Sequence, residues 1–511
     1  MHLRRFIFLA AFPFAACAAA PAVQTPLPPS SRDGVDAAVA TITVPDVQRH
    51  IEFLASDELQ GRDTPSPGLE RAAAYIAAEF RSFGLQPAGD SGTYIQRFPY
   101  TESSIDIAAA RVQARARGTA TDAAFGRDYF MIPAAIDSIV GTPVFAGSAR
   151  PGVAAPAEAA GRILFYYVPG MMGAEWQQAA SAALQASFGA GAGAVVLVLD
   201  STFARSVIAT LADELSGQQV PMPVIGIAFD VARGIVQLAG LDLHALVARS
   251  DAAAAPLTGV TLAIRTPITS STARVPNVVA ILPGSDPALR DEYIVFSAHM
   301  DHVGIGAPDA SGDSIYNGAD DDASGTSAVL EIAQAFASLE RSPARSIVFV
   351  LVSGEEKGLL GSAHFVEQPP VPAARMVANI NMDMIGRNAP DTVVAIGQDY
   401  SSLGVTIQGI SAAHRELGLV VAPDLWPEEQ LFFRSDHFSF AAQEIPAIFF
   451  TTGLHDDYHQ PSDEAHTIDN DKVTRIARLL FRFGHELASS PARPQWTPAG
   501  LAEVRRATGG R

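Results

Sequence analysis

Residues 292–304 read EYIVFSAHMDHVG, and this stretch decides the fold that we expect. Its first half is a nearly continuous apolar run, which is typical of a strand buried on both faces of a parallel sheet. Similar runs are SIVFVLV from Ser346, MVANINM from Met376 and IPAIFFT from Ile445. Helical patterns separate them, including SGTSAVLEIAQAFASL (324–339) and GLLGSAHFVEQ (358–368). We therefore predict an α/β domain with a mixed, mostly parallel sheet between layers of helices.

Polar side chains follow the ends of these predicted strands. They are His299 and Asp301 after the first strand, Glu355 and Glu356 after the second, Asp383 after the third, His459 after the last, and Asp321 before the first intervening helix. Open α/β sheets bind ligands outside the carboxyl ends of their strands. Seven candidate ligands or bases from five segments therefore predict a functional site at this edge.

The residue types at this edge favour metal chemistry. Imidazole and carboxylate donors without a thiolate suit borderline metals. One bridging carboxylate, with a histidine and an acid for each ion, would fill two sites that keep room for water. Such a pair can activate water and polarise a carbonyl. Glu355 and Glu356 can then divide the work between a ligand and a base.

The run NGADDDASG (317–325) places Asp320, Asp321 and Asp322 side by side. Adjacent like charges repel, so the run is expected in water or facing a cation. A calcium loop is the alternative, because the spacing from Asp320 to Glu331 loosely fits the EF-hand pattern. The turn-like residues before Asp320 and the helix start at Ser324 count against calcium.

Length and charge bound the other possibilities. A chain of 511 residues is too long for one core, so two domains or a large insertion are expected. The net charge of −19 offers no basic excess for a nucleic-acid partner. Between 120 and 270 the chain becomes rich in Ala, Gly and Val, with the strands RILFYYV and GAVVLVLD, which indicates an inserted domain.

The first residues predict export. Arg4 and Arg5 precede the apolar run FIFLAAFPFAAC, which is too short to span a bilayer, so residues 1–24 are expected to be a signal peptide. FAAC resembles the bacterial lipobox, which would place a lipid anchor on Cys17; ordinary cleavage is the alternative. The protein would then be periplasmic, a membrane-anchored lipoprotein, or secreted, without an internal disulfide. Residues 25–42 are expected to be a Pro-rich spacer.

Five motifs carry a family resemblance: AHMDHVG, NGADDDASGTSAVLEIA, SGEEKGLLGS, NMDMIG and YHQPSDE. They resemble the di-zinc aminopeptidase family of bacterial leucyl aminopeptidases, whose relatives include glutamate carboxypeptidase and the transferrin receptor. The resemblance implies a zinc exopeptidase fold made from residues 43–119 and 271–490, followed by a tail over 491–511. It also implies that residues 120–270 form a smaller, β-rich protease-associated domain.

The resemblance also implies a role for each polar residue. One zinc ion would bind His299 and Asp383, the second would bind Glu356 and His459, and Asp321 would bridge the two. The other implied roles are Glu355 as general base, Asp301 as the acceptor that orients His299, Tyr458 as an oxyanion donor, and Arg434 as a substrate contact.

The function expected from this resemblance is that of an exported aminopeptidase. It would hydrolyse the N-terminal bond of peptides with a free N-terminus, using two zinc ions per chain. A carboxypeptidase or dipeptidase with the same centre is an alternative, and a glutaminyl cyclase with a single zinc ion is another. The preferred side chain and the oligomeric state carry no motif.

Overall fold

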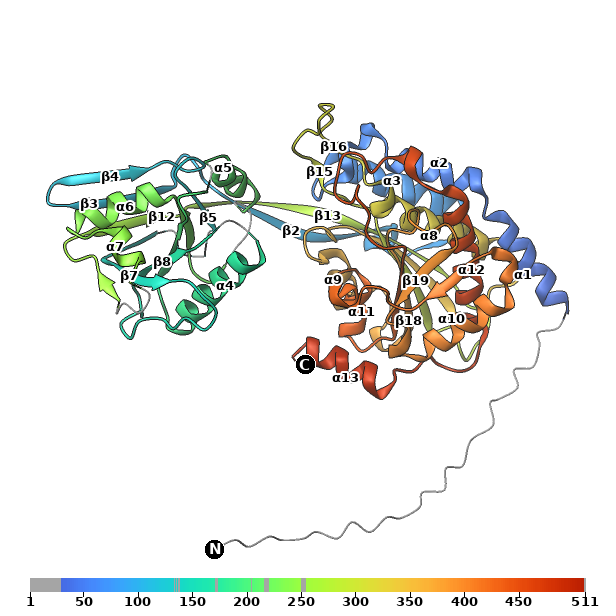
Figure 1. The fold of residues 1–511 in the computed structure, drawn as a ribbon. Coiled ribbons are helices and arrows are strands. Elements are labelled where there is room, and N and C mark those ends of the chain that lie inside the picture. Colours follow the sequence, from blue (N-terminus) through green and yellow to red (C-terminus); the bar gives the residue numbers. More distant parts are fainter. Residues whose placement is uncertain are drawn as a thin grey trace, which may run out of the picture. The chain divides into compact units, whose positions relative to one another are not determined.

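The chain folds into two compact units (Figure 1). The computed structural model describes residues 29–509 except 133, 135, 137, 171–172, 204, 216–219 and 250–253. Unit 1 comprises Met1–Phe98 and Val275–Arg511, and unit 2 comprises Pro99–Arg274. The predicted signal peptide, with Cys17, lies outside the described residues.

The central sheet of unit 1 has nine strands and is parallel in its middle. The four predicted strands are β14 (Tyr293–His299), β17 (Ser346–Val352), β18 (Met376–Met382) and β21 (Ala447–Thr451). They lie in the order β17-β14-β18-β21, and every neighbouring pair is parallel. The remaining strands extend the edges: β1 (Gln86–Pro87), β2 (Ile95–Ile105), β13 (Ile268–Leu282), β19 (Thr392–Ile396) and β20 (Val420–Ala422). β13 and β19 join this centre antiparallel, so the predicted mixed sheet is confirmed.

Helices cover both faces of this sheet (Figure 1). Alternate strand residues divide between two cores: Ile294 and Phe296 belong to one, and Val295 belongs to the other. The helices over the first core are α1 (Pro29–Thr41), α2 (Val44–Leu54), α3 (Pro67–Ser82), α8 (Gly325–Ala337), α10 (Ser402–Ala413) and α12 (Asn470–Ser489). Those over the second are α9 (Leu360–Glu367), α11 (His437–Ala442) and α13 (Pro498–Ala507). Residues buried on both faces explain why these strands are apolar throughout.

Two of the predicted boundaries need correction within unit 1. The expected spacer 25–42 is helical from Pro29, because Ala38, Val39 and Ile42 pack into the core. The expected tail 491–511 contains α13, whose Val504 is buried in the second core. In both segments a few apolar residues supply enough contact to order a stretch that composition alone suggests is a linker.

Unit 2 contains two sheets of its own. The six-stranded sheet has the order β11-β7-β8-β9-β10-β5 and the four-stranded sheet the order β4-β3-β12-β6. Their strands are β3 (Arg111–Ala116), β4 (Thr119–Ala123), β5 (Tyr129–Ile132), β6 (Ser138–Gly141), β7 (Pro143–Ser148), β8 (Ile163–Val168), β9 (Ala194–Leu199), β10 (Val224–Ile227), β11 (Ala255–Pro256) and β12 (Thr261–Arg265). The helices are α4 (Ala174–Gly189), α5 (Arg205–Glu214), α6 (Phe229–Leu238) and α7 (Leu243–Val247). The unit is wider than the predicted 120–270, because β3 pairs with β12 from outside that range.

Short elements surround the carboxyl ends of the parallel strands. The loop after β14 forms the hairpin of β15 (Gly304–Ile305) and β16 (Ile315–Tyr316), and the helical turn η3 (Ala319–Ser324) leads into α8. The turn η1 (Asp57–Arg62) contacts that hairpin. No helix among the described residues is both long and apolar enough to cross a bilayer.

His437 on α11 is a buried, titratable residue of the second core. It is fully buried between Phe432 and Phe449, with ring centroids 4.9 Å away on each side, and burial lowers its pKa to about 3. Between this pKa and the ordinary value of 6.5, the unfolded chain binds a proton that the folded chain does not. Stability therefore falls as the pH falls through this window, by about 1.4 kcal/mol per pH unit from this residue.

A His437→Phe variant should therefore lose less stability in acid than the wild-type protein does. Phenylalanine keeps the aromatic packing and removes the protonation site. The measurement is the midpoint of urea unfolding at about pH 7 and about pH 4.5. An equal loss in both proteins would contradict the analysis.

Candidate metal centre

The predicted ligands converge at the carboxyl ends of the sheet of unit 1. Two groups of side chains each place one donor atom within 4.8 Å of all the others in the group. One group is His302, Asp321, Glu356 and His459; the other is His299, Asp322 and Asp383. All five ligands implied by the sequence motifs are thus brought together, in two sets.

Asp321 lies between the two sets. Its Oδ1 is 3.1 Å from Nε2 of His299, and its Oδ2 is 3.1 Å from Nε2 of His459. His299 Nε2 is in turn 3.6 Å from Asp383 Oδ1, and His459 Nε2 is 3.2 Å from Glu356 Oε2. Each carboxylate oxygen of Asp321 therefore faces a different histidine, and each of these histidines lies beside a different acid, as around a bridging carboxylate.

Several donors in these sets have no hydrogen-bond partner among the described residues, although they are buried. They are both ring nitrogens of His302, Glu356 Oε1 and His459 Nε2. Buried polar groups are normally satisfied, so such a cluster points to an unfilled partner. Nitrogen and oxygen donors without sulfur fit zinc and similar divalent ions. The residues present therefore fit the metal pair that the sequence motifs imply.

The charges in the cluster shift the pKa values of its members. Burial and Asp321 disfavour the charged form of Glu356, but His302 and His459 outweigh them and lower its pKa to about 2. Burial alone would lower the pKa of His459, whereas Asp321 and Glu356 raise it to about 10. Likewise, the carboxylates around His299 overcome its burial and raise its pKa well above the ordinary value. The histidines likewise lower the pKa of Asp321, so Asp321 and Glu356 are held ionised and attract positive charge.

The two acids that flank Asp321 accept hydrogen bonds from backbone N–H groups. Asp322 accepts hydrogen bonds from the backbone N–H groups of His299, Gly325 and Met384, at 3.2, 2.8 and 3.2 Å. Asp320 accepts one from Gly386 at 2.6 Å. Although Asp322 also lies near His299 and Asp383, these contacts already use its oxygens, so we assign it to the scaffold.

The calcium alternative fails on the position of Glu331. Glu331 is a residue of α8, and its carboxylate accepts a hydrogen bond from the backbone N–H of Thr43 and lies 3.3 Å from His50 Nε2. It therefore does not face the acidic run, as the last position of a calcium loop must.

Glu355 lies beside the metal-ligand sets and lines the adjoining pocket. Burial raises the pKa of its carboxyl well above the ordinary value, and the charges of Asp436, Asp383 and Glu356 add to this. His299 opposes the shift but does not cancel it. A carboxylate with a raised pKa is suited to accept and return a proton.

Asp301 does more than its predicted role requires. Its Oδ1 is 3.7 Å from Nδ1 of His299, while the backbone oxygen of Asp301 is closer, at 3.2 Å. Its carboxylate accepts hydrogen bonds from the backbone N–H of Gly354 at 2.7 Å and from the hydroxyl of Thr64 at 2.9 Å. Asp301 therefore joins the strand end that carries His299 to the loop that carries Glu355.

Arg62 is a buried cation beneath the centre. Its guanidinium donates to the backbone oxygens of Leu54, Met300 (2.8 Å), Asn317 (2.7 Å) and Gly318 (3.0 Å). Burial lowers its pKa to about 10, so it stays charged at neutral pH. It ties together the loops that precede His302 and Asp320.

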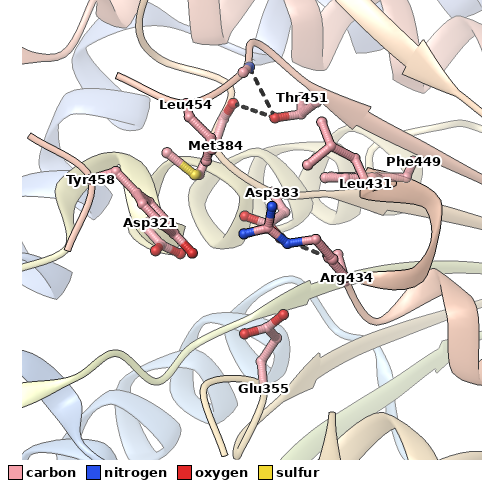
Figure 2. A pocket seen from close by; sticks show the side chains of 12 residues that line it. Asp321, Glu355, Asp383, Met384, Leu431, Arg434, Phe449, Thr451, Leu454 and Tyr458 are labelled. Carbon is pink, nitrogen blue, oxygen red and sulfur yellow. Dashed lines mark hydrogen bonds between the residues drawn. The ribbon is translucent and has the colours of Figure 1, made fainter. Parts of the chain in front are cut away.

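A pocket of about 420 Å³ opens beside the ligands (Figure 2). Asp321, Asp383 and Glu355 line it together with Tyr458 and Arg434. Met384, Leu431, Phe449 and Leu454 add an apolar wall. This mixture of apolar and polar groups is typical of small-molecule sites.

Tyr458 and Arg434 lie in this pocket, as the motifs imply (Figure 2). The ring of Tyr458 stacks on that of His459 with centroids 3.9 Å apart, and burial raises the pKa of its hydroxyl far above the ordinary value. Tyr458 therefore remains a hydrogen-bond donor. Arg434 is partly exposed and lies 3.4 Å from a carboxylate oxygen of Glu429.

Four residues of the centre were not assigned a role from the sequence. They are Arg62, Thr64, His302 and Ser435, whose hydroxyl donates to Asp383 Oδ2 at 2.7 Å. His302 stands within the motif AHMDHVG and Ser435 directly follows the candidate Arg434, so their position was the available signal. Arg62 and Thr64 lie more than 200 residues from the residues they support, in the stretch FLASDELQGRDTPSPG, which also fits the family resemblance but gives neither residue a role.

Curated relatives match the part of the chain that contains the centre. A probable zinc metalloprotease of Pyricularia oryzae is 30% identical over 261 residues, covering 43% of this chain and 51% of that protein. A leupeptin-inactivating enzyme of Streptomyces exfoliatus is 31% identical, covering 37% and 38%. A probable leucine aminopeptidase of Arthroderma benhamiae is 26% identical, covering 42% and 58%. The chain therefore spans 38–58% of the length of these relatives.

Solved structures share the fold over most of the chain. An aminopeptidase from Aneurinibacillus sp. strain AM-1 has a TM-score of 0.56 at 18% identity, covering 91% of this chain and 98% of that one. A zinc aminopeptidase from Bacillus subtilis has a TM-score of 0.51 at 18% identity, covering 88% and 97%. The model of peptidase family M28 matches residues 277–484. The matched residues contain both sets of candidate ligands.

Proposed function

We propose that the chain is a zinc-dependent aminopeptidase that removes the N-terminal residue of peptides. Two zinc ions would bind, one to His299 and Asp383 and the other to Glu356 and His459, with Asp321 between them. The observation that carries this proposal is the division of Asp321, whose two oxygens each lie 3.1 Å from a different histidine. The names of the M28 relatives, which include metalloproteases and aminopeptidases, support the reaction class.

When bound, the metal pair would supply a water of lowered pKa and a positive charge that polarises the carbonyl of the scissile bond. The side chains of the pocket would do the rest. Glu355, with its raised pKa, would take a proton from the attacking water and return it to the departing amine. Tyr458 would donate a hydrogen bond to the developing oxyanion. Asp301 would hold the Glu355 loop against the strand end through Gly354.

The same centre leaves one alternative open. A carboxypeptidase or dipeptidase would use identical metal chemistry and differ in which peptide terminus the pocket accepts. A glutaminyl cyclase works with a single zinc ion, whereas here two sets of candidate donors lie together, and Asp321 contacts a histidine of each set. The two sets favour the dinuclear hydrolase over the cyclase.

Two further expectations remain proposals. We propose export from the signal-like residues 1–24, and we propose that unit 2 is a protease-associated domain. The second rests on its composition and on its place between the two segments of unit 1.

Removing metal should destabilise unit 1. Zinc binds the folded cluster and not the unfolded chain, so it should raise the unfolding temperature of chelator-treated protein. At 100 times its dissociation constant, a bound ion stabilises by about 2.7 kcal/mol. Asp321→Asn should lose most of this gain, while exposed Asp291→Asn should keep it. A zinc response in Asp321→Asn equal to that of the wild type would argue against bridging by this residue.

Glu355→Gln should separate catalysis from metal binding. The amide cannot take a proton, so kcat/KM on a peptide substrate should fall by about 10²–10⁴-fold. The zinc content, measured by atomic emission, should stay that of the wild type. Glu367→Gln, on the exposed end of α9, is the matched control and should be fully active. Near-normal turnover by Glu355→Gln would remove this residue from the mechanism.

One peptide in three forms should identify the terminus that is recognised. The free peptide and its C-amidated form should lose residues from the N-terminus, and the N-acetylated form should stay intact, as followed by mass spectrometry. The reverse pattern, with amidation blocking cleavage, would show a carboxypeptidase and overturn the aminopeptidase proposal.

A further inference from the structure

His302 enters the centre from the same strand end as His299 but faces the other set of donors. Its ring is fully buried, and its Nδ1 is 2.8 Å from Glu356 Oε1 and 3.7 Å from Asp321 Oδ2. His459 faces that same Oδ2 from 3.1 Å. The rings of His302 and His459 meet edge to face, 5.4 Å apart at 76°. The side chains of Glu356, Asp321 and His459 thus surround Nδ1 of His302.

The short contact between His302 and Glu356 is not an aligned hydrogen bond. Within the described part of the chain, neither Nδ1 of His302 nor Oε1 of Glu356 has a hydrogen-bond partner of acceptable geometry. A distance of 2.8 Å would suit a hydrogen bond if the N–H group pointed at the oxygen. The two atoms therefore approach closely without aiming at each other.

Atoms that share a metal ion behave in this way, because both lone pairs aim at the ion. For bonds of about 2.1 Å, ligands at right angles lie roughly 3.0 Å apart and tetrahedral ligands roughly 3.4 Å apart. The distances from His302 and His459 to the oxygens of Glu356 and Asp321 run from 2.8 to 3.7 Å, which brackets this range. The geometry of His302 is thus that of a ligand within the same set.

The ring has little freedom to turn away. A Cβ atom on Gly318 would lie 2.5 Å from Cγ of His302 and 2.6 Å from Cδ2, so only glycine leaves room for the ring. Arg62 holds the backbone on both sides: it donates to the carbonyl of Gly318, and its own carbonyl accepts from the N–H of His302 at 3.4 Å. The loop that carries Asp321 therefore clamps His302 in this orientation.

We infer that His302 is a fourth protein ligand, through Nδ1, at the metal position of Glu356 and His459. The inference rests on the metal pair of the proposed function. With Asp321, that position then has four side-chain donors, whereas the position of His299 and Asp383 has three. Positions filled by four protein ligands are typically structural, and those with three keep a place for water or substrate. The ion beside His302 binds first and more tightly, and the ion beside His299 keeps the open place.

The first test is a stepwise titration of zinc into the metal-free full-length protein by calorimetry. The wild type should bind two equivalents in two resolved steps. His302→Phe should weaken the tighter step by more than about 100-fold, beyond the 10–100-fold that loss of an outer hydrogen-bond partner costs. His437→Phe is the matched control, because His437 is another buried histidine packed against aromatic rings. It should bind both equivalents as the wild type does.

The second test needs no variant to fold. In the dicobalt wild-type protein, proton NMR in water should show three paramagnetically shifted, exchangeable imidazole N–H resonances, from His299, His302 and His459. Two resonances would overturn the inference. So would a loss in His302→Phe confined to the 10–100-fold range, because His302 would then only orient Glu356. If three resonances appear and no peptide is cleaved, the coordination stands and the proposed function alone fails.

Discussion

Buried negative charge at the carboxyl ends of the sheet is the constraint on which the rest of unit 1 depends. Seven aspartates there are buried: Asp301, Asp320, Asp321, Asp322, Asp383, Asp436 and Asp463. An ionised carboxylate in an apolar interior is costly unless hydrogen bonds or positive charge compensate it. The surrounding loops supply both. Backbone N–H groups donate to both oxygens of Asp322 and to one oxygen of Asp320, and the carboxylate of Asp463 accepts from the backbone N–H groups of Asp320 and Asp321.

The need to reach these carboxylates shapes the backbone around them. A Cβ atom on Gly325 would lie 2.4 Å from an oxygen of Asp322, and one on Gly386 would lie 2.9 Å from an oxygen of Asp320. Glycine at both places lets a backbone N–H approach a carboxylate directly. The remaining carboxylate of the run, Asp321, is left with both oxygens directed at histidines. Three adjacent residues of one type therefore have two different functions, and the scaffold decides which.

The sequence could predict the parts of this arrangement that follow from periodicity and position. Apolar runs give the strands β14, β17, β18 and β21, and the polar residues at their ends identify the edge at which the ligands meet. Arg62 could not be predicted in this way, because its guanidinium donates to backbone carbonyls, which no residue type marks. The helix α1 was not predicted because it directly follows a proline-rich stretch that resembles a linker. The place of His302 depends on the direction of one ring, which spacing does not determine.

Protons on the histidines and metal ions are two sources of positive charge at the centre, and one excludes the other. With no ion bound, the carboxylates raise the pKa values of His299 and His459, so these rings hold protons against Asp321. A metal ligand must be a neutral imidazole, so an arriving ion must displace those protons. Arg62 is different, because its guanidinium lies under the loops and donates only to carbonyls. It can therefore lower the electrostatic cost of the buried acids without competing for the donors. The charge of Arg62 is permanent, whereas protons on the histidines and metal ions can exchange. Arg62 therefore continues to compensate the same carboxylates while protons and metal ions replace one another.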